Sequence, residues 1–150
     1  MNLYKTILVA IDLTHYKETL KKARLLADSL GSTLYLVHAV EVLPLGAYSY
    51  IEGANDIKQH LLDLEIQKVR RIAQPFGILE TQQFIKTGSP KQFIIEKANE
   101  LQADLIVIGS YRKTGLEHLL GSTASTLVNC AERDVMVIFT NQSTPSHVNM

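Results

Sequence analysis

The sequence predicts a single α/β domain, in which helices cover both faces of a five-stranded parallel sheet. Two observations predict this class. Short apolar runs rich in valine and isoleucine alternate along the chain with segments whose apolar residues recur at helical spacing. The apolar runs also lack the polar alternation of a half-exposed strand, which indicates strands buried on both faces. The resulting alternation of strands and helices is typical of a doubly wound fold.

Five strands are expected, four of them strongly apolar and one a weaker candidate for the edge of the sheet. The apolar strands are predicted at Thr6 to Ile11, Thr33 to Val40, Leu105 to Gly109 and Val135 to Phe139, and the weaker strand at Glu80 to Lys86. We expect these strands to lie in the order 3-2-1-4-5.

Four helices are expected between the strands. They are predicted at Lys17 to Leu30, Asp56 to Phe76, Pro90 to Leu101 and Thr123 to Ala131. Gly31 is the expected stop of the first helix, because glycine readily takes the left-handed conformation that ends helices. Ser89 and Ser122 are the expected caps of the last two, because serine side chains satisfy free amide groups at a helix start.

Two segments fall outside this regular order. Glu41 to Asn55 is predicted to be a long loop carrying Tyr48 and Tyr50, and loops of such length often have a function. We expect this loop to order when a ligand binds. The polar residues 141–150 form a tail that we expect to be disordered, which leaves residues 1–140 as one domain.

The composition disfavours several classes of partner. Fifteen basic residues balance fifteen acidic ones, so no net charge attracts nucleic acid or an anionic membrane. No apolar stretch approaches the roughly 20 residues that span a bilayer, and the first apolar run is too short for a secretory signal. The single cysteine, Cys130, excludes an internal disulfide and suits a reducing compartment. We therefore expect a cytoplasmic protein.

The stretch "GSYRKTGLEHLLGST", from Gly109 to Thr123, is the main candidate site. It follows a buried strand, and open parallel sheets bind ligands beyond the carboxyl ends of their strands. Gly121 precedes a helix whose first amide groups, at Ser122 and Thr123, can bind an anion, and Arg112 can add a planar donor fork. The chain lacks both G-x-G-x-x-G and the Walker A motif. From its residues alone, the stretch fits a phosphate loop or an ordinary strand-to-helix turn.

Other candidate residues are weaker. Asp12 ends the first strand and fits either a ligand contact or a helix-capping role. His38 lies within an apolar strand, which favours a hydrogen-bonded core residue. The five histidines include no close pair with ligand spacing, so we expect no metal site belonging to the protein itself. Cys130 has no neighbouring base or second thiol in the sequence, which favours a buried structural role.

From Tyr4 to about Phe139 the chain resembles the universal stress protein family. The resemblance lies in "KTILVAIDLT", "LYLVHAVE", "TGSPKQFIIEKANELQADLIVIGS" and "LLGSTASTLVNCAERDVMVIF". Nucleotide-binding members carry G-x-x-G, nine residues, then G-S or G-T. Here Arg112 replaces the second glycine, and eight residues, Lys113 to Leu120, precede Gly121. This spacing is closest to a branch that reads S-H-R, a short loop and L-L-G-S-N-A, and that is associated with adenine nucleotides.

The resemblance implies a site for ATP, ADP or AMP, with or without Mg²⁺. The implied contacts are Ala10, Ile11 and Asp12 at the adenine and ribose, Ala39 at the base, Ile108 and Gly109 at the ribose, and Arg112, Gly121, Ser122 and Thr123 at the phosphates.

A role as a stress-response regulator or switch follows from the same resemblance, together with a homodimer formed through Val135 to Thr140. Two alternatives stay open. One is a slow ATPase or nucleotidyl-transfer enzyme that uses the same pocket. The other is a dimeric stress protein that binds no nucleotide.

Overall fold

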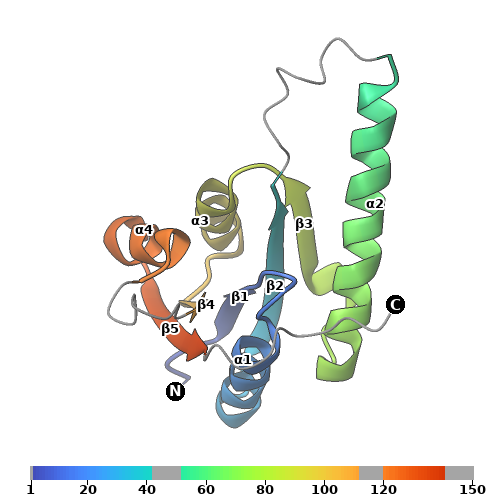
Figure 1. Cartoon of the computed structure of the whole chain (residues 1–150). Helices are drawn as coiled ribbons and strands as arrows, with labels where there is room; N and C mark the ends of the chain where they lie inside the picture. The colour runs from blue at the N-terminus through green and yellow to red at the C-terminus, as the bar shows by residue number, and fades with distance from the viewer. Residues whose placement is uncertain (1, 42–51, 112–119, 141–150) are drawn as a thin grey trace.

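A computed structural model of the chain describes residues 2–41, 52–111 and 120–140, and its elements follow the predicted order (Figure 1). The strands are β1 (Thr6–Ala10), β2 (Thr33–Val40), β3 (Gln83–Thr87), β4 (Leu105–Tyr111) and β5 (Asp134–Thr140). The helices are α1 (Lys17–Leu30), α2 (Ala54–Ala73), α3 (Pro90–Leu101) and α4 (Ser122–Cys130), with short 3-10 turns η2 (Gln74–Phe76) and η3 (Glu80–Gln82). Most of the predicted long loop, the centre of the glycine-containing stretch and the polar tail lie outside the described residues.

The five strands form one parallel sheet in the order β3-β2-β1-β4-β5, as predicted. β1 lies at its centre, where Ile7 is paired with Leu34 of β2 on one side and with Leu105 of β4 on the other. The chain therefore leaves β1 toward β2 and β3 and later crosses back to β4 and β5. This reversal creates the switch point at which doubly wound sheets bind ligands.

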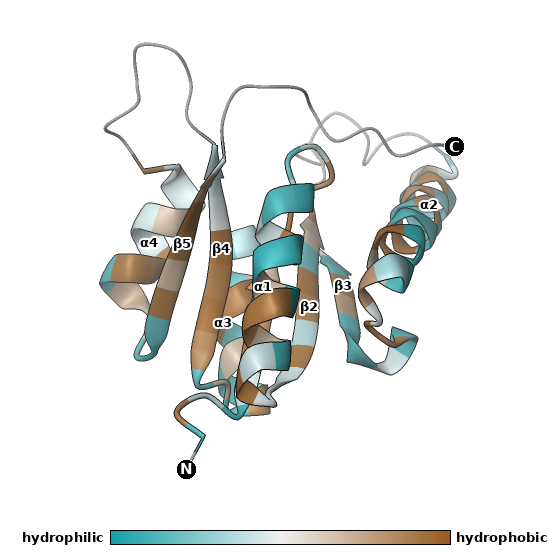
Figure 2. Cartoon of the chain, turned by 90° about the horizontal axis from the view of Figure 1, so that it is seen from below, coloured by the Kyte–Doolittle hydropathy of each residue, from teal (hydrophilic) through white to brown (hydrophobic). Residues whose placement is uncertain are grey.

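Two apolar layers hold the helices on opposite faces of the sheet (Figures 1 and 2). Ile7 and Val9 of β1 pack in the layer that includes residues of α1 and α2. Leu8 and Ala10, whose side chains point the other way, pack in the layer that includes residues of α3 and α4. Alternate side chains of one strand thus reach both layers, which explains why β1 is apolar at each position from Ile7 to Ala10.

Several boundaries differ from the prediction. β1 ends at Ala10, one residue before the predicted end. β4 continues to Tyr111, because β5 pairs with it as far as Thr140. β3 is an edge strand but begins only at Gln83, because the preceding three residues form η3.

Helix ends differ as well. α2 begins at Ala54, inside the predicted loop, and ends at Ala73. The next three residues form η2, where Pro75 has no amide hydrogen for an α-helical bond. α1 has its predicted bounds, and Gly31 ends it with a φ of 66°. Ser89 precedes α3, but its side chain makes no capping hydrogen bond, contrary to the prediction.

Candidate functional site

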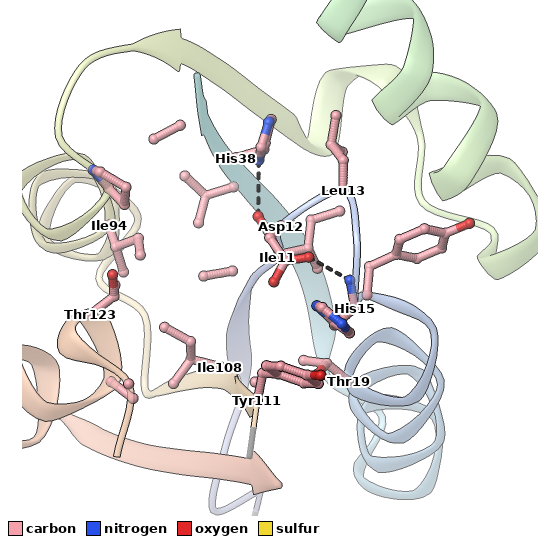
Figure 3. Close-up of a pocket in the computed structure, with 18 of the residues that line it drawn as sticks. Ile11, Asp12, Leu13, His15, Thr19, His38, Ile94, Ile108, Tyr111 and Thr123 are labelled. Carbon is pink, nitrogen blue, oxygen red and sulfur yellow. Dashed lines mark hydrogen bonds between the residues drawn. The ribbon is translucent and has the colours of Figure 1, made fainter. Parts of the chain in front are cut away.

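A cavity of about 550 Å³ opens at the carboxyl ends of β1, β2 and β4 (Figure 3). Its walls also include the turn before α1, residues of α2 and α3, and the first turn of α4. This position is the topological switch point described above, since β1 lies between β2 and β4.

Nine of the ten predicted site residues line this cavity. They are Ala10, Ile11, Asp12, Ala39, Ile108, Gly109, Gly121, Ser122 and Thr123. The tenth, Arg112, lies outside the described residues. The fold therefore brings together four segments that are far apart in the sequence, while the role of each residue in binding stays a prediction.

The two described glycines of the candidate stretch have different neighbours. A Cβ atom at Gly109 would lie 2.5 Å from Oγ1 of Thr19, a buried residue of α1. Gly109 is therefore explained by the close packing of α1 on β4. At Gly121 a Cβ would meet, among the described residues, only Ser110 Oγ, at 3.8 Å, which is ordinary contact. Packing against the described residues thus gives no reason for a glycine at position 121.

The first turn of α4 contains backbone amides that make no hydrogen bond within the helix. Gly121 is the residue before the helix; its amide donates to Ser110 Oγ at 3.1 Å, and its carbonyl accepts from Ser125 at 2.9 Å. That bond is the first of the helix, so the amides of Ser122, Thr123 and Ala124 precede it. Ser122 is the first helical residue rather than the expected cap, and no side-chain cap is present. These residues line the cavity.

Asp12 holds together the turn that connects β1 to α1. Its Oδ1 accepts hydrogen bonds from the amides of Thr14, at 2.7 Å, and His15, at 2.5 Å. The cap position of α1 itself is Tyr16, so Asp12 stabilises the turn before the helix rather than the helix start. Figure 3 places the Asp12 carboxylate near the middle of the cavity, while Thr123 lies on the opposite side from His15.

His38 is buried and hydrogen-bonded, which confirms the prediction of a core residue. Its Nδ1 lies 2.9 Å from the carbonyl oxygen of Ile11, and its Nε2 lies 2.9 Å from Oε2 of Glu65 on α2. Both His38 and Glu65 also line the cavity, which the sequence did not predict. No local sequence signal links residues that lie 27 positions apart on a strand and a helix.

A stacked aromatic pair forms another wall. The rings of His15 and Tyr111 lie 4.0 Å apart between centroids, with an angle of 22° between their planes. The sequence did not predict this pair either, because β4 was expected to end two residues earlier. Tyr16 also lines the cavity, and its burial raises the pKa of its hydroxyl above the ordinary value of 10.0.

Other predictions concern residues outside the cavity. Cys130 is exposed at the end of α4, so the expectation of a buried structural cysteine was wrong. The buried side chains of this short helix are instead Ala124 and Leu127. Among the described residues, no three histidine, cysteine or acidic side chains are grouped as metal ligands. No described helix is both long and apolar enough to span a membrane.

Comparisons with known proteins fit this geometry. A model of the universal stress protein family matches residues 3–138. The chain belongs to this family. Universal stress protein A homolog 2 of Coxiella burnetii is 34% identical over 141 residues, which cover 92% of this chain and 97% of the relative. Membership in the branch associated with adenine nucleotides stays a prediction.

Solved structures of other proteins have the same fold. Universal stress protein UspA from Lactobacillus plantarum superposes with a TM-score of 0.72 at 22% identity, covering 90% of this chain and 97% of that one. A universal stress protein solved in complex with cAMP has a TM-score of 0.57 at 20% identity, covering 91% of this chain and 97% of that one.

Proposed function

We propose that this universal stress protein binds ATP or another adenine nucleotide in the cavity and acts as a stress-response switch. The observation that carries the proposal is the first turn of α4. Its amides at Ser122, Thr123 and Ala124 precede the first helical hydrogen bond and line a cavity at the switch point of the sheet. Helix starts of this kind attract phosphate, because their amide hydrogens and the helix dipole both favour negative charge.

The size of the cavity supports the same ligand class. Its volume of about 550 Å³ falls within the range of roughly 300–1,000 Å³ that is usual for small-molecule and cofactor sites. The cAMP complex of a structural neighbour shows that another protein of this fold binds an adenine nucleotide.

The charge of the described lining indicates how the phosphates would be held. Asp12, Glu41 and Glu65 line the cavity, and no lysine or arginine does so among the described residues. A polyphosphate next to these carboxylates needs added positive charge. We therefore propose that ATP binds as its Mg²⁺ complex, and that Arg112 contributes a phosphate contact.

Direct extraction and titration test the proposal. The purified protein is denatured and its released small molecules are separated by chromatography; stripped protein is then titrated with ATP, with and without Mg²⁺. We expect released adenine nucleotide and saturable binding that is stronger with Mg²⁺. Absence of both released nucleotide and ATP binding would refute the proposal and favour the nucleotide-free alternative.

Gly121→Val is the matching variant. Its side chain would project where the proposed phosphates approach, yet a Cβ there makes only ordinary contact with Ser110, so the fold should persist. We expect about a tenfold or greater loss of ATP affinity, since one to two charge-assisted hydrogen bonds would be lost. Asn129→Ala, near the other end of α4, is the control and should bind as the wild type does.

We also propose a homodimer through the free edge of β5. In the described part of the chain β5 pairs with β4 alone, and Met136 on β5 is 37% exposed. Exposed strand edges tend to pair with another chain. Light scattering after gel filtration should give a dimer mass for the wild type and a monomer for Met136→Lys. Leu25→Lys, on the exposed side of α1, is the control and should stay dimeric.

A further inference from the structure

The cavity has two chemically different ends, and their positions follow from the strand order. α4 connects β4 to β5 at one side of the sheet, and α2 connects β2 to β3 at the other, with β1 between them. The α4 end offers backbone donors. The α2 end offers His38, Ala39 and Val40 from β2 and the carboxylate of Glu65. If phosphates occupy the α4 end, as the proposed function requires, the nucleobase lies toward Glu65.

The described side-chain contacts of His38 and Glu65 at the α2 end leave one carboxylate oxygen available as an acceptor. Both ring nitrogens of His38 are engaged, one with the Ile11 carbonyl and the other with Glu65 Oε2. The second carboxylate oxygen of Glu65, Oε1, lies 3.9 Å from the Lys68 ammonium, which is longer than a hydrogen bond. The Glu65 side chain is 25% exposed, so it is partly withdrawn from water while it lines the cavity.

From this arrangement we infer that Glu65 determines base selectivity, by accepting a hydrogen bond from an exocyclic amino group. An ionised carboxylate can only accept hydrogen bonds. It therefore stabilises a purine with an amino group at position 6 and repels a purine with a carbonyl there. The inference rests on the proposed function, because it takes the position of the phosphates from it.

His38 is the positioning residue for this contact. It is only 8% exposed, and both of its partners are acceptors. The charged groups that face the pair from α2 are Glu65 itself and Lys68. Because the Ile11 carbonyl anchors one nitrogen, the other nitrogen holds the Glu65 carboxylate in one place at the cavity wall.

The test compares ATP with ITP, which differ at purine position 6 and carry the same triphosphate. Calorimetric titration with both ligands, in the presence of Mg²⁺, should show that the wild type prefers ATP by about tenfold or more, since a site built around one hydrogen bond discriminates strongly. Glu65→Gln presents both a donor and an acceptor, so the preference should fall below about threefold. Asp63→Asn, on the exposed side of the same helix, should keep the wild-type preference.

Two His38 variants test the positioning role through the same ratio of affinities. His38→Gln keeps a donor near the position of Nε2 and should retain the ATP preference. His38→Asn keeps a donor only near Nδ1 and should lose it, although each variant gives up one hydrogen bond. A merely structural role would instead lower the affinity for both nucleotides alike.

The outcomes separate the two proposals. Equal affinity of the wild type for ATP and ITP overturns the role of Glu65 and leaves nucleotide binding intact. An unchanged preference in Glu65→Gln does the same. Binding of neither nucleotide overturns the proposed function, and the inference with it.

Discussion

Replacing Gly109 with alanine should destabilise the protein through one identified contact. The added Cβ would lie 2.5 Å from Thr19 Oγ1 and 3.6 Å from Thr19 Cβ. The first distance is far inside van der Waals contact, and overpacking of this kind costs about 1–3 kcal/mol. Alanine also lowers the conformational entropy of the unfolded chain, which stabilises the folded state by about 0.4–1 kcal/mol. We expect a net loss of about 1–2 kcal/mol in the free energy of unfolding.

Urea unfolding followed by circular dichroism measures this loss. With a denaturant slope of about 2 kcal/mol/M, the midpoint should fall by about 0.5–1 M. In a Thr19→Ala background the short contact is gone, and only the ordinary contact with the Cβ remains. There, Gly109→Ala should be neutral or should stabilise by up to about 1 kcal/mol. The two substitutions should therefore be coupled by about 1–3 kcal/mol.

Thr19→Ser is the matched control, because it removes the methyl group and keeps the oxygen that the new Cβ would strike. Gly109→Ala should remain destabilising in that background. An equal loss in the wild-type and Thr19→Ala backgrounds would refute the reasoning, since the requirement for glycine would then have another cause.

Three further changes have expected outcomes. Burial raises the pKa of the Tyr16 hydroxyl, so above pH 10.0 the unfolded state loses this proton first and the free energy of unfolding falls. In Tyr16→Phe, urea unfolding should show a smaller decrease in this free energy between neutral pH and a pH above 10.0 than in the wild type. Cys130 is exposed, so it should react with a thiol reagent in the folded protein as fast as in urea, and slow labelling would contradict its placement. The Asp104 carboxylate accepts hydrogen bonds from the backbone amides of Lys5 and Thr6. Asp104→Ala should therefore lower the free energy of unfolding by about 1–3 kcal/mol. A loss of less than about 0.5 kcal/mol would show that these hydrogen bonds are dispensable.

The fold could be predicted where local pattern and tertiary environment agree. Both ends of the helix α1 (Lys17–Leu30) were predicted correctly, because its apolar face points to the core and Gly31 takes a left-handed conformation. β3 was placed three residues early, because the Gln82 side chain accepts the amide of Leu79 and the backbone turns before the strand begins. The sequence pattern contains no signal of such a turn.

The candidate site was predictable only in part, for a related reason. Asp12 and Ala39 lie at or just after the ends of β1 and β2, and Gly121 directly precedes the helix that follows β4. The topology alone collects such positions at one edge of the sheet. Glu65 reaches the cavity from the middle of α2, where its side chain contacts a histidine on a strand. Tyr111 reaches it because the β4–β5 ladder is longer than the apolar run. Both depend on three-dimensional packing that no spacing rule contains.

The central place of β1 has a consequence for synthesis on the ribosome. β1 can pair with β2 soon after both emerge, since Thr6 faces Thr33. Its other edge is completed only by β4, where Ile7 faces Leu105, about 100 residues later. At typical translation rates that interval is roughly 5–20 s, longer than most small domains need to fold. One edge of β1 therefore stays without its native partner strand until β4 leaves the exit tunnel.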